Sequence, residues 1–212
     1  MWAAVLWDLD GTLVDTEPVW MAAELELAAE HGVEWTHDDG LALVGLALPD
    51  SGAYIQRRLE SELTPAAIVD YLVKRVAASL EQFVPWRPGA LDLVAAFADA
   101  GVPQALVTMS YAPIATAVAH HVPFAAVVTG DAVVMGKPDP EAYLTAASLL
   151  GCEPADCLAI EDSPTGAASA SAAGCEVLVI PHLVDVPMAP RRFTHETLTG
   201  LSPSMLWAGR LS

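Results

Sequence analysis

Asp8-Leu9-Asp10-Gly11-Thr12 decides the fold of this chain, because it directly follows a short apolar run, Met1 to Trp7. A run of this length that ends near a glycine predicts a buried strand. Side chains two residues apart on a strand point to the same side, so Asp8 and Asp10 lie together at its carboxyl end. Two neighbouring carboxylates repel each other unless a cation or a shared proton relieves them. Ligands of open α/β sheets bind at this end of the strands, so the pair predicts a site, although Asp and Gly also favour a simple turn.

Short apolar runs recur along the chain and alternate with helical stretches from about residue 88 onward. This alternation predicts an α/β fold with a parallel sheet and helices on its faces. Right-handed crossovers place the carboxyl ends of all strands at one edge. The expected strands are Ala3–Trp7, Gln104–Thr108, Ala125–Thr129, Cys157–Ile160 and Glu176–Ile180, and the expected helices are Leu91–Ala100, Pro113–His120, Pro140–Leu150 and Pro164–Ala173.

The segment from Asp15 to Trp86 interrupts the alternation with a series of helices, expected at Pro18–His31, Asp50–Ser61 and Pro65–Phe83. A helical insert directly after the first strand is typical of a lid, and the stiff stretch Pro85–Gly89 is its hinge candidate; alternatively, these helices pack as part of the core. We expect a core domain of residues 1–14 and 87–212 and a helical cap domain of residues 15–86. The proline-rich stretch after Pro181 is expected to run over the surface.

The composition limits the class of protein. With 212 residues, 54% hydrophobic and 17% charged, the chain has room for a large buried core. Its formal net charge of −18 repels nucleic acid and anionic membranes, so we expect neither as a partner. We find no membrane-spanning stretch and no signal peptide, and we expect a cytoplasmic location. The three cysteines (Cys152, Cys157 and Cys175) show no metal spacing, and their odd number argues against a disulfide framework.

The first motif supplies a candidate nucleophile and a candidate acid/base. The Asp8 carboxylate can attack phosphorus and form an aspartyl-phosphate. Asp10 can protonate the leaving oxygen and then activate water. Gly11 allows the sharp exit from the strand, and the Thr12 hydroxyl can orient the pair.

Thr108 and Lys137 predict a phosphoryl-binding site. Thr108 is the last residue of the second expected strand. Its hydroxyl, with the backbone N–H groups of Met109 and Ser110, can form a binding site for an anion. The alternative is a threonine that simply ends a strand, which is common. Lys137 precedes a helix, where it can neutralise a phosphoryl group and the nucleophile. The chain has only two lysines, Lys74 and Lys137, which favours a functional role for Lys137 over that of a solvated loop residue.

Glu161 and Asp162 follow the fourth strand and would add to the acidic cluster of Asp8 and Asp10. Oxygen ligands around a phosphate site suit Mg²⁺. The alternative is a helix N-cap, in which Asp162 or Ser163 caps the next helix and Glu161 favours its dipole. Four charged or polar features at four strand ends are hard to assign to capping alone.

These four motifs, in this order, resemble the haloacid dehalogenase-like superfamily of phosphotransferases over roughly residues 3 to 182. The chain is similar to its subgroup of phosphoglycolate phosphatases, small sugar-phosphate phosphatases and β-phosphoglucomutase. The resemblance implies a Rossmann-like, three-layer α/β/α core with an inserted α-helical cap. It implies a Mg²⁺-dependent phosphatase that hydrolyses a small phosphorylated metabolite through an aspartyl-phosphate, and we expect a monomer or weak dimer.

The resemblance also assigns roles by position. Asp8 is the nucleophile and Asp10 the acid/base, and Thr108 and Lys137 bind the transferring phosphoryl group. Asp8, the backbone carbonyl of Asp10 and Asp162 hold Mg²⁺, with Glu161 acting directly or through water. The residues that line the phosphoryl site are Gly11, Thr12, Thr108, Met109, Ser110 and Lys137.

The chain departs from the mutases of this subgroup in the cap. Trp20 stands where they have a histidine, and Leu48, in the loop of residues 44–50, stands where they have an arginine for the distal phosphate. A mutase must hold a bisphosphate, so transfer to water is favoured here. A hexose phosphate phosphomutase remains the alternative, and a non-catalytic metal-binding relative comes third. In the core, Met109 replaces a small or amide residue.

Five cap residues are candidate readers of the leaving group, although two of them, Trp20 and Leu48, also suit the interior of the cap. The histidines show no ligand spacing, and we expect all of them at the surface or at helix ends. The five readers are Trp20, Glu24, Leu46, Leu48 and Lys74, and the histidines are His31, His37, His120, His121, His182 and His195.

Overall fold

The computed structural model of the chain describes residues 1–43 and 46–209. Six parallel strands form one sheet in the order β3-β2-β1-β4-β5-β6, with β1 in an interior position. The five expected strands are confirmed to within one residue at each end. The strands are β1 (Ala4–Trp7), β2 (Gln104–Val107), β3 (Ala126–Val128), β4 (Cys157–Glu161), β5 (Glu176–Val179) and β6 (Arg192–Thr194).

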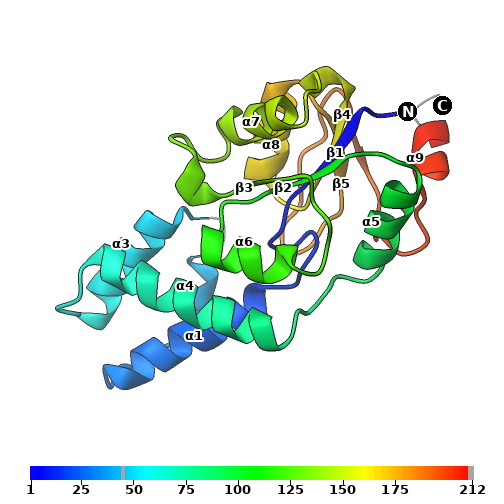
Figure 1. Ribbon diagram of the computed structural model, residues 1–212. Helices are drawn as coiled ribbons and strands as arrows, with labels where there is room; N and C mark the ends of the chain where they lie inside the picture. The colour runs from blue at the N-terminus through cyan, green and yellow to red at the C-terminus, as the bar shows by residue number, and fades with distance from the viewer. Residues whose placement is uncertain (44–45, 210–212) are drawn as a thin grey trace.

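Helices cover both faces of the sheet (Figure 1). On one face lie α5 (Ala90–Asp99), α6 (Ala112–Ala119) and α9 (Pro203–Gly209), and on the other α7 (Glu141–Leu149) and α8 (Pro164–Ala173). Short 3₁₀ turns, η1 (Gly130–Ala132) and η2 (Pro154–Asp156), precede α7 and β4. This arrangement confirms the predicted three-layer α/β/α core.

The alternation of side chains along β1 explains why the sheet needs both helical layers. Val5 and Trp7 belong to the apolar cluster under α5 and α6, whereas Ala4 and Leu6 belong to the cluster under α7 and α8. The Trp7 ring meets Phe97 of α5 edge to face, with the ring centroids 6.3 Å apart. Both faces of β1 are therefore dry, as a buried parallel strand requires.

Residues between β1 and α5 form α1 (Glu17–Glu30), α2 (His37–Leu41), α3 (Leu48–Leu59) and α4 (Pro65–Gln82). The three long helices agree with the expected ranges to within two residues. The short α2 was not expected, because five residues with two aspartates and a glycine show no helical periodicity. It depends on a capping box, in which Thr36 and Asp39 each bond to the other's backbone N–H group, and on the ion pair of Asp39 with Arg58 at 2.7 Å.

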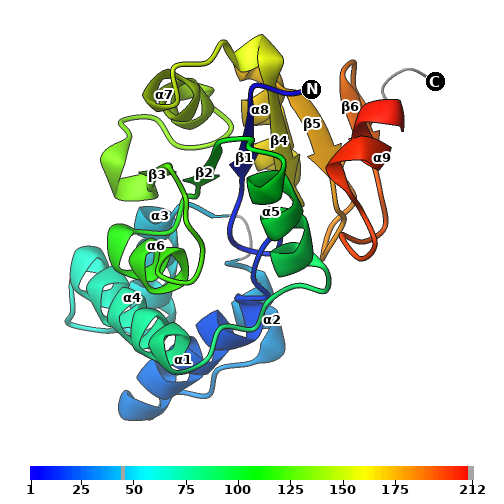
Figure 2. The ribbon, with the colours of Figure 1, turned by 45° about the vertical axis from the view of Figure 1, so that its right-hand side comes forward.

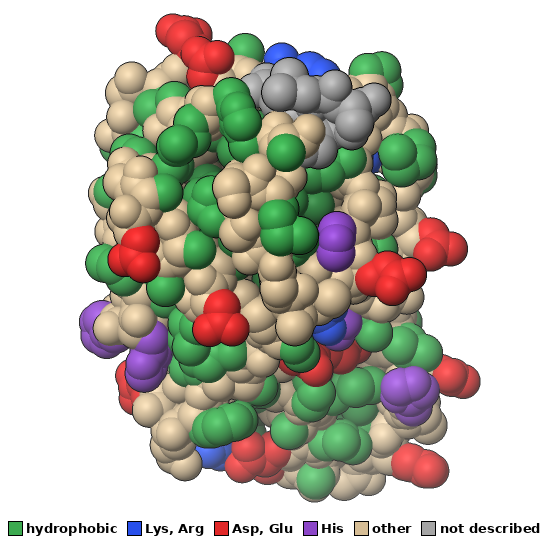
Figure 3. Space-filling view, turned by 90° about the vertical axis from the view of Figure 1, so that its right-hand side faces the viewer, with side chains coloured by type: hydrophobic (Ala, Val, Ile, Leu, Met, Phe, Trp, Pro, Cys, Tyr) green, Lys and Arg blue, Asp and Glu red, His purple; other side chains and the backbone are tan. Residues whose placement is uncertain are grey.

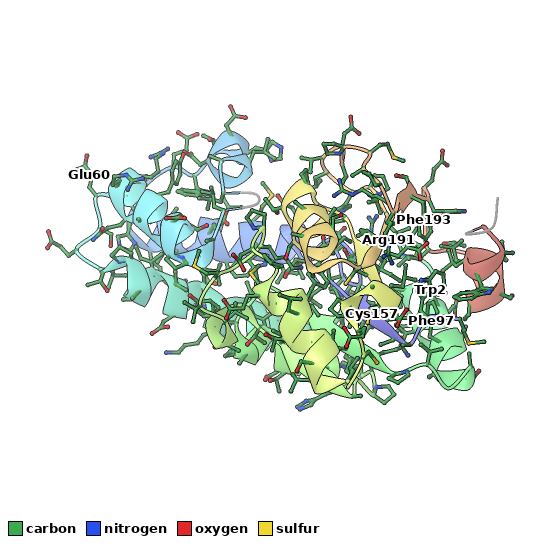
Figure 4. The ribbon with its side chains drawn as sticks, turned by 90° about the horizontal axis from the view of Figure 1, so that it is seen from above. Trp2, Glu60, Phe97, Cys157, Arg191 and Phe193 are labelled. Carbon is green, nitrogen blue, oxygen red and sulfur yellow. The ribbon has the colours of Figure 1, made fainter. Side chains whose placement is uncertain are left out.

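The helical insert lies beyond the carboxyl ends of the strands. The arrows of β1 and β5 point toward it in Figure 2, and Figure 4 places Glu60, after α3, at the opposite end of the molecule from Trp2 and Phe193. Helix α4 packs along α6, so the insert also contacts one helical layer of the core (Figure 1). No helix in the described ranges is long and apolar enough to cross a membrane.

The two junctions of the insert run side by side. The backbone N–H of Asp15 donates to Pro85 O at 2.9 Å, and that of Arg87 donates to Leu13 O at 2.8 Å. Val14 and Trp86 form an antiparallel bridge between these bonds. The chain therefore leaves and re-enters the sheet region at one place.

The stretch after Pro181 is mostly exposed or half-buried, as expected for a surface segment, but it also forms two elements that were not expected. It contributes β6, which pairs with β5, and α9, whose Trp207 meets Trp2 edge to face with the ring centroids 5.3 Å apart. A strand of three residues shows no clear alternation, and Leu198 and Leu201 are buried only because distant segments pack on them. On the side of the molecule that carries this segment, red carboxylates are scattered among apolar side chains and basic groups are few (Figure 3).

A substitution at Gly89, just before α5, tests how closely the stretch after Pro181 packs against the start of that helix. The φ of Gly89 is +83°, and a Cβ there would overlap the backbone of Leu198 and Thr199. Gly89→Ala is therefore expected to lower the free energy of unfolding by roughly 2–4 kcal/mol in urea titrations. Gly101 is the matched control, because its φ is +69° with no atom within 4 Å of an added Cβ. Gly101→Ala should cost only about 1–2 kcal/mol, and equal losses would contradict the close packing.

Glu24 of α1 provides a test of the insert's interior. It is buried, and it accepts a hydrogen bond from Trp35 Nε1 at 3.3 Å. Burial raises the pKa of Glu24 from 4.5 to about 7, although the Trp35 bond opposes this shift. Since the folded chain favours the neutral acid, the stability that Glu24 contributes is complete below pH 4.5 and is lost as the pH rises through 7.

Glu24→Gln cannot ionise and should escape this loss. The variant is expected to gain about 3 kcal/mol over the parent between pH 4.5 and pH 8, measured as the difference between the two free energies of unfolding in urea. A difference that stays constant over this range would show that Glu24 is not buried as described.

Candidate active site

The carboxyl ends of three neighbouring strands bring the predicted residues together. Asp8 follows β1, Thr108 follows β2, and Glu161 ends β4 with Asp162 directly after it. Because β2, β1 and β4 are adjacent and parallel, their ends meet at one edge of the sheet. Lys137 comes from the loop before α7 and reaches the same place.

Lys137 joins these groups through its ammonium. Its Nζ donates to Asp8 Oδ1 at 2.7 Å, to Glu161 Oε1 at 2.6 Å and to Val107 O at 3.0 Å. The side chain is only 5% exposed. Burial alone would lower the pKa of Lys137, but the carboxylates of Asp8 and Glu161 raise it above its ordinary value, so the lysine stays charged.

The acidic side of the site fits a divalent cation. Asp8 Oδ2 is buried and has no hydrogen-bond partner in the described part of the chain. Burial and then Glu161 raise the pKa of Asp8 to about 7 despite Lys137, and burial and then Asp8 raise that of Asp162 to about 9. Oxygens of Asp8, Glu161 and Asp162 lie within 4.8 Å of one another. When Asp8, Glu161 and Asp162 are all ionised, the Lys137 ammonium balances one of their three negative charges. A divalent cation would balance the other two.

Glu161 differs from the other two acids because protein donors surround it. Its Oε1 accepts from Lys137 Nζ and from the Tyr143 hydroxyl at 2.8 Å. Its Oε2 accepts from the backbone N–H of Asp162 at 3.2 Å and from the N–H and hydroxyl of Ser163 at 3.4 and 3.1 Å. The Glu161 carboxylate is thereby fixed in place before any ligand binds.

Asp10 is clamped between the insert and the core. Its Oδ1 accepts from the Thr16 hydroxyl at 2.7 Å and from Trp20 Nε1 at 3.5 Å, both on the α1 side. Its Oδ2 accepts from the hydroxyls of Thr108 at 3.1 Å and Ser110 at 2.8 Å, after β2. Thr16 is the N-cap residue of α1, but its hydroxyl bonds to Asp10 and not to the helix.

The loop after β2 supports both the expected anion-binding site and the lysine. Thr108 Oγ1 accepts from the backbone N–H of Ser110 at 2.9 Å, which forms a tight turn. The sulfur of Met109 accepts from the backbone N–H of Lys137 at 3.2 Å. The methionine, noted as a departure in the sequence, thus supports the segment that presents Lys137.

Gly11 and Thr12 line the site beside Asp162. A Cβ on Gly11 would overlap the Asp162 carboxylate, and the Thr12 hydroxyl donates to Asp162 Oδ1 at 3.4 Å. His182 lies beside the same position, with its Nδ1 3.2 Å from that Cβ and its Nε2 3.6 Å from Asp15 Oδ1. The expectation that every histidine lies at the surface or at a helix end was wrong for His182, whose side chain is 14% exposed.

Sequence reasoning missed the roles of Thr16, Tyr143 and His182. Thr16 was visible at the end of the first motif, and its small hydroxyl side chain six residues after Asp10 was the available signal. Tyr143 lies in an apolar stretch of α7, and His182 follows the last predicted strand, so neither showed a local pattern. Only the packing of the sheet brings them to the acids.

The residues of the insert that were candidates for contact with the leaving group lie in different environments. Trp20 reaches Asp10, whereas Glu24 is buried against Trp35 inside the insert. Residues 44–45 of the expected cap loop lie outside the described residues. The remaining candidates are Leu48, which is half-buried at the start of α3, and the exposed Leu46 and Lys74.

Comparisons with known proteins agree with this geometry. The family model for haloacid dehalogenase-like hydrolases matches residues 2–174. Hexitol phosphatase A of Escherichia coli K12 is 34% identical over 188 residues, which cover 86% of this chain and 84% of that protein. Fructose-1-phosphate phosphatase YqaB of the same organism is 30% identical over 181 residues, covering 84% and 95%.

A solved structure shows the same architecture over nearly the whole chain. CbbY from Rhodobacter sphaeroides, in complex with phosphate, superposes with a TM-score of 0.83 at 28% identity and covers 95% of this chain and 96% of its own. The chain belongs to the family of haloacid dehalogenase-like hydrolases.

Proposed function

We propose that this chain is a Mg²⁺-dependent phosphatase that hydrolyses a small phosphorylated metabolite through an aspartyl-phosphate. One observation carries the proposal. Asp8 is buried with one oxygen fixed 2.7 Å from Lys137 Nζ, while the other oxygen has no hydrogen-bond donor within the described residues. A buried carboxylate in this state is prepared for a phosphoryl group and a cation, and not for a purely structural ion pair.

In the first step, an oxygen of Asp8 forms a bond to phosphorus while the bond from phosphorus to the leaving oxygen breaks. Asp10 gives its proton to the leaving oxygen, so the alcohol departs neutral. The Lys137 ammonium offsets the charge on the phosphoryl oxygens. The hydroxyls of Thr108 and Ser110, which bond to Asp10 in this structure, bind the phosphoryl group when it is present.

In the second step, Asp10 removes a proton from water. The resulting oxygen forms a bond to phosphorus, and the bond between phosphorus and Asp8 breaks. Inorganic phosphate leaves, and Asp10 is protonated again for the next leaving group. The four donors around Asp10 hold it beside the loop that would bind the phosphoryl group, as both roles require.

The free oxygen of Asp8, the Asp162 carboxylate and the backbone carbonyl of Asp10 would hold Mg²⁺. When bound, the cation neutralises charge on the phosphoryl oxygens. The acidic cluster supports a divalent ion in general, and the all-oxygen donor set favours Mg²⁺ among divalent ions.

The helices of residues 15–86 act in this proposal as a cap domain over a core of residues 1–14 and 87–212. The insert lies beyond the strand ends, and Trp20 touches the acid/base, so the leaving group meets α1. Named relatives that act on hexitol and fructose phosphates favour phosphorylated sugars and polyols as substrates. A cytoplasmic location, a monomer or weak dimer, and the lack of a nucleic-acid partner stay predictions.

Phosphate release from a panel of phosphomonoesters tests the function. The panel contains hexitol phosphates, fructose 1-phosphate, other hexose phosphates, glycerol phosphates, 2-phosphoglycolate and nucleoside monophosphates. We expect Mg²⁺-dependent release, strongest with sugar or polyol phosphates, and loss of release in excess chelator with recovery when Mg²⁺ is restored. Isomerisation of β-glucose 1-phosphate without release would instead identify a mutase.

Two matched substitutions separate the roles of the aspartates. Asp8→Asn should abolish turnover because the amide cannot form the aspartyl-phosphate, and Asp10→Asn should lower kcat by on the order of 10² or more. Asp92→Asn, on the exposed side of α5, is the control and should match the parent. Turnover that survives in Asp8→Asn would refute the nucleophile assignment, and equal behaviour of all three variants would favour a non-catalytic relative.

A further inference from the structure

Tyr143 is a fully buried residue of α7 that touches two members of the site at once. Its hydroxyl donates to Glu161 Oε1 at 2.8 Å. Lys137 Nζ lies 5.1 Å from the centroid of its ring, within the range of a cation–π contact. Burial raises the pKa of Tyr143 well above its ordinary value, so the hydroxyl keeps its proton and remains a donor.

The Glu161 carboxylate has no oxygen left for a cation. Its Oε1 accepts from Lys137 and Tyr143, and its Oε2 from the backbone of Asp162 and from two groups of Ser163. A carboxylate offers about four lone-pair positions, and five donors contact this one. A Cβ on Gly166 would overlap it, so the first turn of α8 closes the remaining side.

The other two acids of the cluster are differently placed. Asp8 Oδ2 is buried without a partner in the described ranges. Asp162 accepts a bond of 3.4 Å from the Thr12 hydroxyl, at the long limit for a hydrogen bond. These two carboxylates can turn an oxygen to a cation at little cost, whereas Glu161 would have to break short bonds to Lys137 and Tyr143.

We propose that Tyr143 is a positioning residue: its hydroxyl holds Glu161 on Lys137, so that Glu161 anchors the ammonium against Asp8 and leaves the metal to Asp8 and Asp162. The proposal rests on the phosphatase function above. It assigns Glu161, one of the predicted metal residues, to the phosphoryl-binding side of the site.

Loss of the Tyr143 hydroxyl should change the rate of phosphoryl transfer and the affinity for Mg²⁺ in different ways. Removing the Tyr143 hydroxyl frees a lone pair on Glu161 Oε1 and loosens the anchor of Lys137. Phosphoryl transfer should therefore slow, while Mg²⁺ binding stays equal or becomes tighter because Glu161 is free to turn toward the cation. A general loosening of the fold would instead weaken both.

Tyr143→Phe is the test, since it removes one oxygen from a buried ring. We would measure the Kd for Mg²⁺ by calorimetry on metal-free protein, without substrate, and kcat on the best panel substrate at saturating Mg²⁺. The expected result is a loss of about 10-fold in kcat, typical of a lost hydrogen bond to a charged group, with a Kd no weaker than that of the parent. Tyr71→Phe is the matched control, because the Tyr71 hydroxyl donates to Glu30 at 2.9 Å within the insert, and it should change neither value.

A further variant tests whether Asp162 holds the metal. Asp162→Asn should weaken Mg²⁺ binding by at least about 10-fold if Asp162 is a ligand. Tyr143→Phe with a kcat within twofold of the parent, or with kcat and Mg²⁺ affinity falling together, would overturn the positioning role. Failure of the phosphatase function would appear separately, as a parent that releases no phosphate from any substrate but still gives a Mg²⁺ titration.

Discussion

The ammonium of Lys137, buried between Asp8 and Glu161, is the interaction on which the rest of the site depends. Burying carboxylates together is costly unless a positive charge and good hydrogen bonds compensate them. Here one Nζ lies 2.7 Å from Asp8 and 2.6 Å from Glu161. The geometry requires β1 and β4 to be neighbours and the loop before α7 to reach their ends, where Met109 supports its backbone. The order of the strands thus sets the charges around Asp8, the proposed nucleophile.

Asp10 shows how the insert takes part in the chemistry of the core. Its two oxygens face opposite sides, one bonded to Thr16 and Trp20 near α1 and the other to Thr108 and Ser110 after β2. In its proposed role as proton donor, Asp10 would meet the leaving group at the boundary between the insert and the core. The two junctions of the insert are hydrogen-bonded to each other in antiparallel fashion, close in sequence to Asp10. The contacts of the insert with Asp10 therefore lie where the proposed acid/base would act.

Because the chain is so acidic, binding of a phosphorylated substrate depends on positive charge placed locally at the site. With nine basic residues against 27 acidic ones, the chain as a whole repels a phosphorylated substrate. A buried lysine and a divalent cation concentrate positive charge at one point, where the low polarity of the surroundings strengthens it. In the proposed arrangement, Glu161 serves this positive charge, because its bonds to Lys137 and Tyr143 would keep the ammonium in place.

Local signals in the sequence, such as an apolar run, a glycine or a strand end, were sufficient to predict the five main strands and the long helices. The same signals pointed to five site residues, whose roles stay predictions although the structure brings their side chains to one edge of the sheet: Asp8, Asp10, Thr108, Lys137 and Asp162. The places of β6, α9, Tyr143 and His182 could not be predicted in this way. Their contacts join segments far apart in the chain, as when Trp207 of α9 meets Trp2 edge to face, and no pattern within a short window records which distant residue will cover them. The donors that surround Glu161 likewise come together only in the fold, and no local pattern in the sequence predicted them.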